Sequence, residues 1–400
     1  MTDVGRPRFR FRSVSSAGLV LGAIVLLAGA TADAGWDPTE QMALALGVFA
    51  ITMWTTKSVP ISISSVAIVS LLPLLGLVEG FSAAASGFAT RLIFFLILLF
   101  LLGEVVAKTD LDEQFAKRLI LASSTPKRSF QKLSEYLFVV AIFMPSGIAR
   151  AITFVPLVDT LNDMYGLSDR SDFLDASFLF LGHVNPIASL ALMTGGGMAL
   201  LSSEIIRMNV RPVGWLEWAV YMVPPVLTLY FAAVLLIQTV YQVDDATSAS
   251  VADDVGPMTG EQRIVAVVMT VTISLWLAGS LVGIPTILPP LLAVVVLAAP
   301  GIGIVTGSDV GNLNWDVLLM VGAVLSLVDV LQSSGALERV IDALLAVVPL
   351  ATYPTWLSVL AILSGTVIVR MLFSTGSACL AVTLPVIIPL AKSTAGLGDR

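Results

Sequence analysis

The sequence MPSGIARA occupies residues 144–151, and the sequence FSTGSAC occupies residues 373–379. Both are short runs of small and polar residues set inside long apolar segments. In each, a proline follows the central Ser or Thr by ten residues: Pro156 follows Ser146, and Pro385 follows Thr375. Backbone breaks and hydroxyl groups occur at membrane depth where they line a cavity or are buried against protein. Two such breaks in matching places predict a substrate site between two halves of a membrane protein.

The composition places the chain in lipid. Apolar residues make up 57% of the sequence and charged residues 12%, whereas a soluble domain has roughly 25% charged residues. Long apolar runs such as 264–282 suit a hydrocarbon core of about 30 Å, and they lack the alternation of a membrane β-barrel. We therefore predict an all-α polytopic membrane protein. No basic stripe indicates a nucleic-acid partner, and the single cysteine, Cys379, excludes an internal disulfide.

Basic residues predict the orientation. Residues 1–38 form a basic segment and a first helix, and their four early arginines place the N-terminus in the cytoplasm. Helices are expected over 14–32, 39–56, 61–78 and 91–108. If each of these four helices crosses the membrane once, residues 108–135 are cytoplasmic, in agreement with their six Lys and Arg residues. Residues 117–120 are expected to form part of a short helix at the membrane surface. We expect a multi-pass protein of the cell (inner) membrane.

Residues 39–242 form a predicted first repeat. It contains a re-entrant hairpin over 136–158, because Pro145, Ser146 and Gly147 interrupt that apolar segment. It also contains a broken helix over 176–206, where Asn185-Pro186 and residues 194–197 oppose a continuous helix. A final helix covers 214–241. An acidic linker follows over 243–262.

Residues 263–400 form a predicted second repeat. The tip residues of the two halves and the apolar runs ending at Trp54 and Trp276 correspond at an offset that grows from about 221 to 229 residues. An odd number of crossings separates corresponding points, so the repeats have inverted topology. The second re-entrant hairpin, over 357–390, then enters from the opposite side. A full second repeat would need roughly 60 more residues, so we expect this repeat to be truncated at its C-terminus.

Several segments resemble one family. The sequences WTTKSVP at 54–60, WDVLL at 315–319 and NPIAS at 185–189, together with both hairpin tips, are similar to the divalent anion:sodium symporter family. That family includes plastid dicarboxylate exchangers, and the tip at 145–151 resembles the exchanger-like branch most. The resemblance implies a transport domain that moves as a rigid body against a scaffold, often in a homodimer. It implies dicarboxylate, tricarboxylate or sulfate substrates, usually with Na⁺.

The tips also depart from the family pattern. Family members carry Ser-Asn-Thr at each tip, and their asparagines contact substrate and help to build the sodium sites. The matching residues are Ser146-Gly147-Ile148 and Thr375-Gly376-Ser377, so glycine replaces asparagine in both. Lys57 stands where an acidic residue is common.

The tips and the broken helix supply the candidate site residues. Half-helix N-termini attract anions, whereas unwound carbonyl groups suit Na⁺. The substrate-binding candidates are Ser146, Gly147, Arg150, Thr375, Gly376 and Ser377. The ion-binding candidates are Pro145, Ser146, Asn185, Ser189, Thr194 and Ser374. Close packing of small tip residues and capping of freed backbone groups are the alternative interpretations.

Charged residues within apolar sequence are costly and usually functional or paired. Arg150 could hold a carboxylate or sulfate with two hydrogen bonds, and a structural ion pair is the alternative. Arg370 could act similarly or pair with Glu104 or Asp329. The single histidine, His183, could couple protons, but a core histidine with satisfied hydrogen bonds is the favoured interpretation.

These features predict a secondary active transporter of small divalent anions that works by alternating access and is coupled to Na⁺. An anion exchanger or an H⁺-coupled carrier of the same fold is the first alternative, and a non-transporting membrane receptor is the second. We expect no enzyme, because no acid–base pair lies at a shared membrane depth. We also expect no cofactor and no metal site beyond Na⁺.

Overall fold

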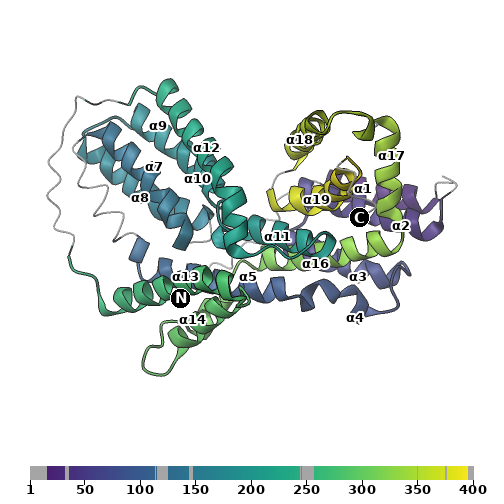
Figure 1. Ribbon diagram of the computed structural model, residues 1–400, viewed down its shortest axis with the longest axis horizontal. Coiled ribbons are helices and arrows are strands. Elements are labelled where there is room, and N and C mark those ends of the chain that lie inside the picture. The colour runs from purple at the N-terminus through teal and green to yellow at the C-terminus, as the bar shows by residue number, and fades with distance from the viewer. Residues whose placement is uncertain are drawn as a thin grey trace, which may run out of the picture. The chain divides into compact units, whose positions relative to one another are not determined.

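The computed structural model describes residues 16–31, 36–112, 114, 125–143, 147–243, 245, 256–348, 350–373 and 376–394. Every regular element in these ranges is a helix, in agreement with the predicted class (Figure 1). The chain divides into two compact units, one formed by residues 1–90 and 315–400 and the other by residues 91–314.

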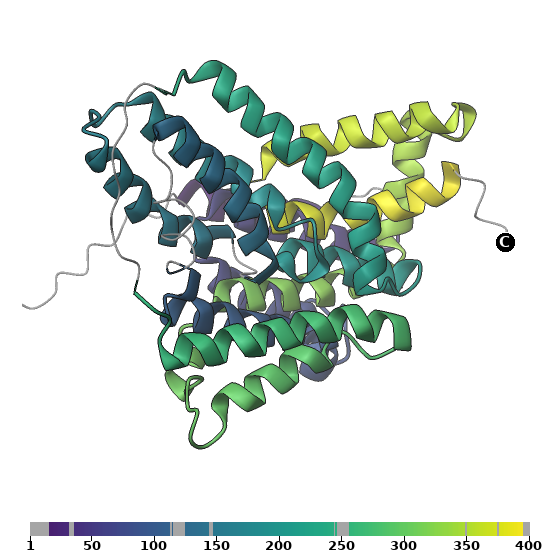
Figure 2. The same ribbon diagram turned by 60° about the vertical axis from the view of Figure 1, so that its left-hand side comes forward.

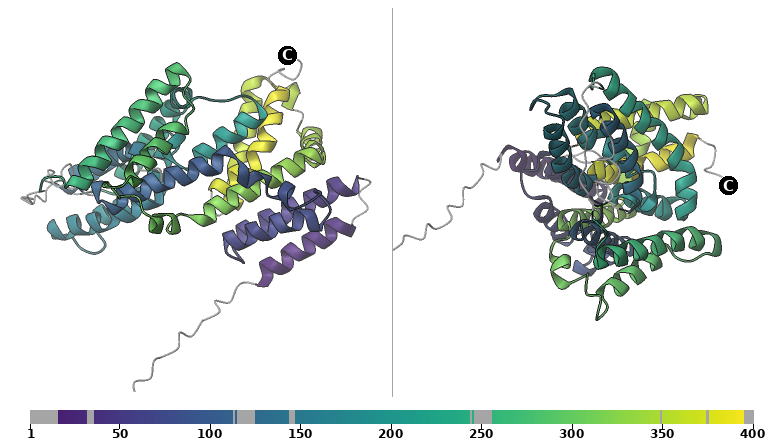
Figure 3. Two further views of the ribbon diagram at one scale, coloured as in Figure 1. Left: turned by 90° about the horizontal axis from the view of Figure 1, so that it is seen from below. Right: turned by 90° about the vertical axis from the view of Figure 1, so that its left-hand side faces the viewer.

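The first unit joins the beginning and the end of the chain. Its helices are α1 (Ser16–Thr31), α2 (Pro38–Thr56), α3 (Ile61–Leu74), α4 (Phe81–Ala84), η1 (Ser86–Ala89), α16 (Trp315–Ser333), α17 (Ala336–Val347), η4 (Leu350–Thr352), α18 (Thr355–Leu372) and α19 (Gly376–Thr394). The helices α1 and α2 lie side by side, as Figure 3 shows in purple. A small apolar core joins α17, α18 and α19 around Leu337, Ile341 and Leu390.

The second unit holds the middle of the chain. Its helices are α5 (Arg91–Lys108), α7 (Pro126–Phe143), α8 (Gly147–Met164), α9 (Asp172–Leu179), the π-helical turn η2 (Phe180–Val184), α10 (Asn185–Ala188), η3 (Met193–Gly195), α11 (Gly197–Asn209), α12 (Trp215–Val240), α13 (Gly260–Val282), α14 (Leu288–Ala298) and α15 (Gly307–Gly311). Its main core lies among α7, α8, α9 and α12, where Phe130 and Tyr230 pack edge-on against Phe180. The helices α13 and α14 lie against each other, as Figure 2 shows in green.

Local sequence accounts for several helix ends. Asp37 caps α2 by accepting a hydrogen bond from the Thr39 amide at 2.8 Å, and Pro38 occupies the first turn, where its missing N–H costs nothing. Thr259 and Gln262 form a capping box at the start of α13. That helix ends at Gly283 with φ of +78°, a conformation that favours glycine.

The predicted helix boundaries need correction. The helices α7 and α8 begin earlier and end later than the predicted hairpin over 136–158, and α18 and α19 similarly extend beyond 357–390. Residues 260–262, predicted as linker, form the start of α13. The helix predicted over 61–78 ends at Leu74. The basic N-terminal segment, the surface helix at 117–120 and most of the acidic linker lie outside the described residues.

Within the described residues, three helices are long and apolar enough to cross a membrane, namely α12, α13 and α16. Shorter apolar stretches lie in α1, α3, α14, α18 and α19. The helices α2 and α5 were also predicted as spans but do not belong to this set. In α5, charges at Arg91, Glu104 and Lys108 interrupt an otherwise apolar sequence.

The order of elements recurs along the chain. The helices α2, α3, a short helical segment and α5 are followed later by α13, α14, the short α15 and α16. The helices α7 and α8 begin at 126 and 147, and α18 and α19 begin 229 residues later, at 355 and 376. Pro156 and Pro385 are each the tenth residue of their helices.

The compact units do not coincide with the predicted repeats, because each unit combines early helices of one repeat with later helices of the other. In the first unit, α16 packs against α3 and η1. In the second, the equivalent helix α5 packs against α14 and α15. Corresponding helices therefore make corresponding contacts.

The contact between η1 and α16 requires glycine. The Gly87 amide donates to the Ser326 hydroxyl oxygen at 3.0 Å. A Cβ added at Gly87 would lie 2.2 Å from the Gly322 carbonyl oxygen and 2.6 Å from the Ser326 nitrogen, both backbone atoms.

The contact between α5 and α15 is ionic. The Lys108 ammonium donates to both Asp309 carboxylate oxygens at 3.1 Å and to the Ile304 carbonyl oxygen at 3.0 Å. Burial raises the pKa of Asp309, but hydrogen bonds from the Thr306 amide and hydroxyl and from Lys108 outweigh it, so the pKa lies below its usual value. The short helix α15 lies outside the three candidate spans.

We predict that Gly87→Ala lowers the free energy of unfolding by about 1–3 kcal/mol, because α16 must move away from η1. Gly47→Ala in α2 is the matched control, since its Cβ would meet only Leu331 methyl groups at 3.7 Å. Thermal unfolding of the purified protein in detergent measures both. Equal midpoints for the two variants would contradict the packing described.

We predict that Asp309→Asn destabilises the protein at pH 7 and that this difference shrinks in acid. A carboxylate whose folded pKa is depressed stabilises the folded state above its unfolded pKa of about 3.9, and the contribution is lost as the pH falls through the folded pKa. Thermal midpoints of the two proteins between pH 7 and pH 3.5 check this. A difference that does not change with pH would show that the charge of Asp309 is not involved.

Candidate functional site

The first predicted tip lies between α7 and α8, which pack against each other. Pro145 and Ser146 lie outside the described residues. Gly147 is the first residue of α8, and Arg150 follows within the same turn. The first amide groups of a helix have no partner within it and carry partial positive charge, so this turn suits an anion.

Arg150 is completely buried and hydrogen-bonded to neutral oxygens of the broken helix. Its Nε donates to the Asn185 side-chain Oδ1 at 2.8 Å. Its Nη2 donates to the Asn185 carbonyl oxygen at 3.2 Å and to the Ser189 Oγ at 2.6 Å. One guanidinium thus joins the first tip to two of the predicted ion-binding residues.

Asn185 completes this connection. Its side-chain Nδ2 donates to the Gly147 carbonyl oxygen at 2.8 Å and to the Leu181 carbonyl oxygen at 3.4 Å. It lies where the π-helical turn η2 meets α10, and Pro186 follows it without an amide hydrogen to donate. This irregular backbone directs the Asn185 side chain and carbonyl oxygen toward α8. We call Gly147, Arg150, Asn185 and Ser189 the arginine cluster.

The predicted glycine-rich break folds back onto the arginine cluster. A Cβ at Gly195 would lie 2.6 Å from the Ser189 carbonyl oxygen and 3.1 Å from its carbonyl carbon, so the two backbones touch. The adjacent Thr194 is buried, and its Oγ1 accepts a hydrogen bond from the Trp215 Nε1 at 3.0 Å. The structure therefore brings together four of the predicted site residues and places Thr194 beside them.

The second predicted tip belongs to the other compact unit. Ser374 and Thr375 lie outside the described residues, and the side chain of Ser377 is not described. Gly376 is the first residue of α19. The Arg370 Nη1 donates to the Phe373 carbonyl oxygen at 2.6 Å, so this arginine caps the end of α18. The residue of α19 that corresponds to Arg150 is Cys379, the fourth in its helix, and it is buried.

The remaining charged candidates take no part in the hydrogen bonds described above for the arginine cluster. His183 is exposed within η2, which corrects its interpretation as a core residue. Glu104 is partly buried in α5, and Asp329 is exposed on α16. Among the described residues, no group of three or more His, Cys, Asp or Glu could hold a metal ion.

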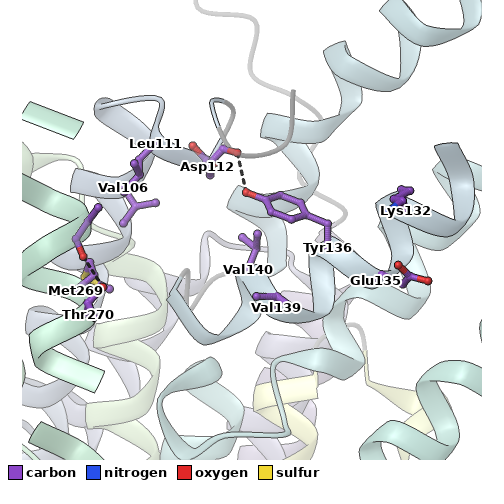
Figure 4. A pocket seen from close by; sticks show the side chains of 11 residues that line it. Val106, Leu111, Asp112, Lys132, Glu135, Tyr136, Val139, Val140, Met269 and Thr270 are labelled. Atoms are coloured by element: carbon purple, nitrogen blue, oxygen red, sulfur yellow. Dashed lines mark hydrogen bonds between the residues drawn. The ribbon is translucent and has the colours of Figure 1, made fainter. Parts of the chain in front are cut away.

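A cavity of about 450 Å³ in the second unit lies elsewhere (Figure 4). Its walls come from the end of α5, from α7 and from α13, and they are mostly aliphatic, with Tyr136 directed toward Asp112. None of the predicted site residues lines it. Its charged lining residues are Lys132 and two carboxylates, Asp112 and Glu135.

Two tryptophans were missed by the sequence analysis. Trp215 binds Thr194, and the Trp218 Nε1 donates to the Leu190 carbonyl oxygen at 3.1 Å. Both stand at the start of α12, immediately after the broken helix. Buried indole N–H groups usually find an acceptor. The broken helix just before them leaves carbonyl groups without helical donors, and this closeness in sequence could have indicated the two contacts.

We predict that Gly195→Ala disrupts the site, because the added Cβ meets the Ser189 backbone and cannot be accommodated by a side-chain movement. The expected loss is about 1–3 kcal/mol of stability. Gly182→Ala in the adjacent π-helical turn is the control, since nothing lies within 4 Å of its Cβ. Thermal unfolding of the two purified variants in detergent measures this effect. Identical behaviour of the two variants would contradict the close approach.

Comparison with known proteins agrees with these features. The family profile described as "Sodium:sulfate symporter transmembrane region" matches residues 14–399. Dicarboxylate transporter 1, chloroplastic, from Spinacia oleracea is 26% identical over 72% of this chain and 54% of its own length. The protein of the same name from Arabidopsis thaliana is 25% identical over 81% and 59%, respectively. A "Membrane protein" from Cupriavidus necator is 22% identical over 90% and 75%.

The chain thus spans little more than half the length of the two dicarboxylate transporters. The family and these transporters are not enzymes, which confirms that prediction. The profile match covers nearly the whole sequence and also confirms the resemblance carried by the tips and the broken helix. The chain is a multi-pass membrane protein that belongs to the divalent anion:sodium symporter family.

Proposed function

We propose that the protein is a secondary transporter of small divalent anions, either dicarboxylates, tricarboxylates or sulfate, that works by alternating access in the cell membrane. The observation that carries the proposal is the arginine cluster. It places a buried guanidinium at the N-terminal turn of α8, where partial and full positive charges act together. The names of the two plant relatives favour dicarboxylates.

The recurring element order supports two repeats, each with its own tip. The helices α8 and α19 both begin with a glycine at a predicted tip and both carry a proline at their tenth position. In the proposed mechanism, the two halves are inverted repeats and the N-terminus is cytoplasmic. The proposed substrate contacts are residues 146–150 in one tip and 375–377 in the other, and a transport domain moves against a scaffold in a homodimer.

The coupling mechanism follows from what Arg150 contacts. Amide, carbonyl and hydroxyl oxygens in an unwound segment are suitable ligands for Na⁺. Here the guanidinium is bonded to these oxygens of Asn185 and Ser189. A tethered cation competes with a diffusible ion for the same oxygens, so we infer that this half needs no Na⁺.

A fixed cation favours anion exchange over Na⁺ symport. When the empty carrier returns to the other side of the membrane, the Arg150 charge moves through apolar surroundings without the negative charge of the substrate to balance it. This movement is costly. At the corresponding position of the second half, the neutral Cys379 supplies no such charge. Na⁺ symport remains the alternative, and it requires the ion to bind in the second half.

We predict that proteoliposomes loaded with unlabelled succinate take up labelled succinate or malate rapidly, with little change when Na⁺ is replaced by K⁺. Vesicles without internal anion should show slow uptake, because the unloaded carrier returns slowly. Initial rates with labelled succinate, malate, citrate and sulfate measure this. Saturable uptake into anion-free vesicles driven by a Na⁺ gradient would exclude exchange, and no saturable uptake of any anion would contradict transport itself.

Substitutions of Arg150 sharpen this experiment. Arg150→Ala should lower exchange at least about tenfold, because at least one charge-assisted hydrogen bond is lost, and Arg150→Lys should retain more activity since it keeps a cation. Arg170→Ala is the matched control, because that arginine is exposed on a loop. Equal and mild effects of both Arg150 variants would assign the residue to packing alone.

A further inference from the structure

The broken helix between α10 and α11 is held by two buried tryptophans. The Trp215 Nε1 donates to the Thr194 hydroxyl oxygen at 3.0 Å, and the Trp218 Nε1 donates to the Leu190 carbonyl oxygen at 3.1 Å. The segment between α10 and α11 has only the short η3 as regular structure, and the few backbone hydrogen bonds that the structure shows within it are single turns from the amides of Ser189, Leu190, Ala191 and Gly195. The contacts from α12 add side-chain hydrogen bonds to these turns.

Trp215 is itself fixed from the opposite side. Its ring stacks on that of Trp276 in α13, with centroids 6.2 Å apart and an interplanar angle of 12°. The Trp276 Nε1 donates to the Thr286 carbonyl oxygen at 2.8 Å, so this second ring is also held in place. A nearly parallel stack between two buried indoles leaves Trp215 little rotational freedom.

Thr194 is adjacent in sequence to Gly195, which contacts the arginine cluster. Gly195 touches the backbone of Ser189, and the Ser189 Oγ accepts the hydrogen bond from Arg150 at 2.6 Å. A shift of Thr194 would therefore move Gly195 against Ser189 and change the geometry of the guanidinium. Because core contacts transmit displacement with little slack, the indole acts on the site without touching the anion.

We propose that Trp215 is a positioning residue of the anion site. Its indole N–H fixes the Thr194 hydroxyl, and its stack on Trp276 connects that hydrogen bond to α13. The inference rests on the proposed function for its effect on a small divalent anion. The hydrogen bond and the order it imposes on residues 189–196 can be tested without transport.

The transport test uses Trp215→Phe, which keeps an aromatic ring against Trp276 while it removes the N–H donor and part of the buried ring system. The half-saturation concentration for succinate exchange should rise roughly three- to tenfold, the size of one hydrogen bond, while the maximal rate per folded protein changes little. Thr194→Val removes the same hydrogen bond from the other side and should act equally. Thr194→Ser, which keeps the hydroxyl, should restore near-normal behaviour.

A double-substitution cycle separates positioning from general destabilisation. Trp215→Phe combined with Thr194→Val should have a smaller effect than the sum of the two single changes, because both remove one shared interaction. Trp218→Phe combined with Thr194→Val should be additive, since these residues have different partners. Additive effects in the first pair, or a lower thermal midpoint with an unchanged half-saturation concentration, would overturn the proposal.

Hydrogen–deuterium exchange supplies a readout that is independent of function. In Trp215→Phe and in Thr194→Val, amides of residues 189–196 should exchange faster than in the wild type, whereas those of α14 should not change. Unchanged exchange in 189–196 would overturn the positioning role. If the wild type exchanges no anion, the proposed function fails, while faster amide exchange in the variants would still support the hydrogen bond itself.

Discussion

A positive charge buried among apolar helices is the constraint on which the rest of the site depends. Arg150 has no exposed surface, so its guanidinium must find acceptors within the protein. A regular helix offers none, because its carbonyl groups are already bonded. The Ser189 amide donates to the Pro186 carbonyl oxygen, which leaves the Asn185 carbonyl oxygen to the guanidinium, and Ser189 adds a hydroxyl. The broken helix and the charged tip therefore require each other.

The same constraint makes the two halves chemically different. Corresponding helices begin with glycine and carry proline at the same position, but the fourth residue is Arg150 in α8 and Cys379 in α19. Arg370 is not a substitute, since it is exposed and caps the end of α18 through the Phe373 carbonyl oxygen. One half thus carries its own cation. The proposal of anion exchange rests on this difference.

Much of the fold could be predicted from sequence, because apolar runs, prolines and glycines act locally. The breaks near 185 and 194, the α12 helix and the helices on either side of residues 144–146 followed from these signals. Helix ends were less accurate, since polar residues such as Asp159 and Asp163 extend α8 where a loop was expected. Exposed polar residues do not stop a helix when its opposite face is packed.

The site residues could be named from sequence, but their contacts could not. Arg150 was predicted to bind the substrate anion, and Asn185 was predicted to bind the coupling ion. In the structure, the two side chains are hydrogen-bonded to each other. Residues 35 positions apart carry no spacing signal for such a pair.

The most direct measurement is an experimental structure in lipid nanodiscs with succinate and Na⁺. We predict the Arg150 guanidinium between Asn185 and Ser189 with no ion there, whereas Na⁺ at those oxygens with Arg150 displaced would contradict the account.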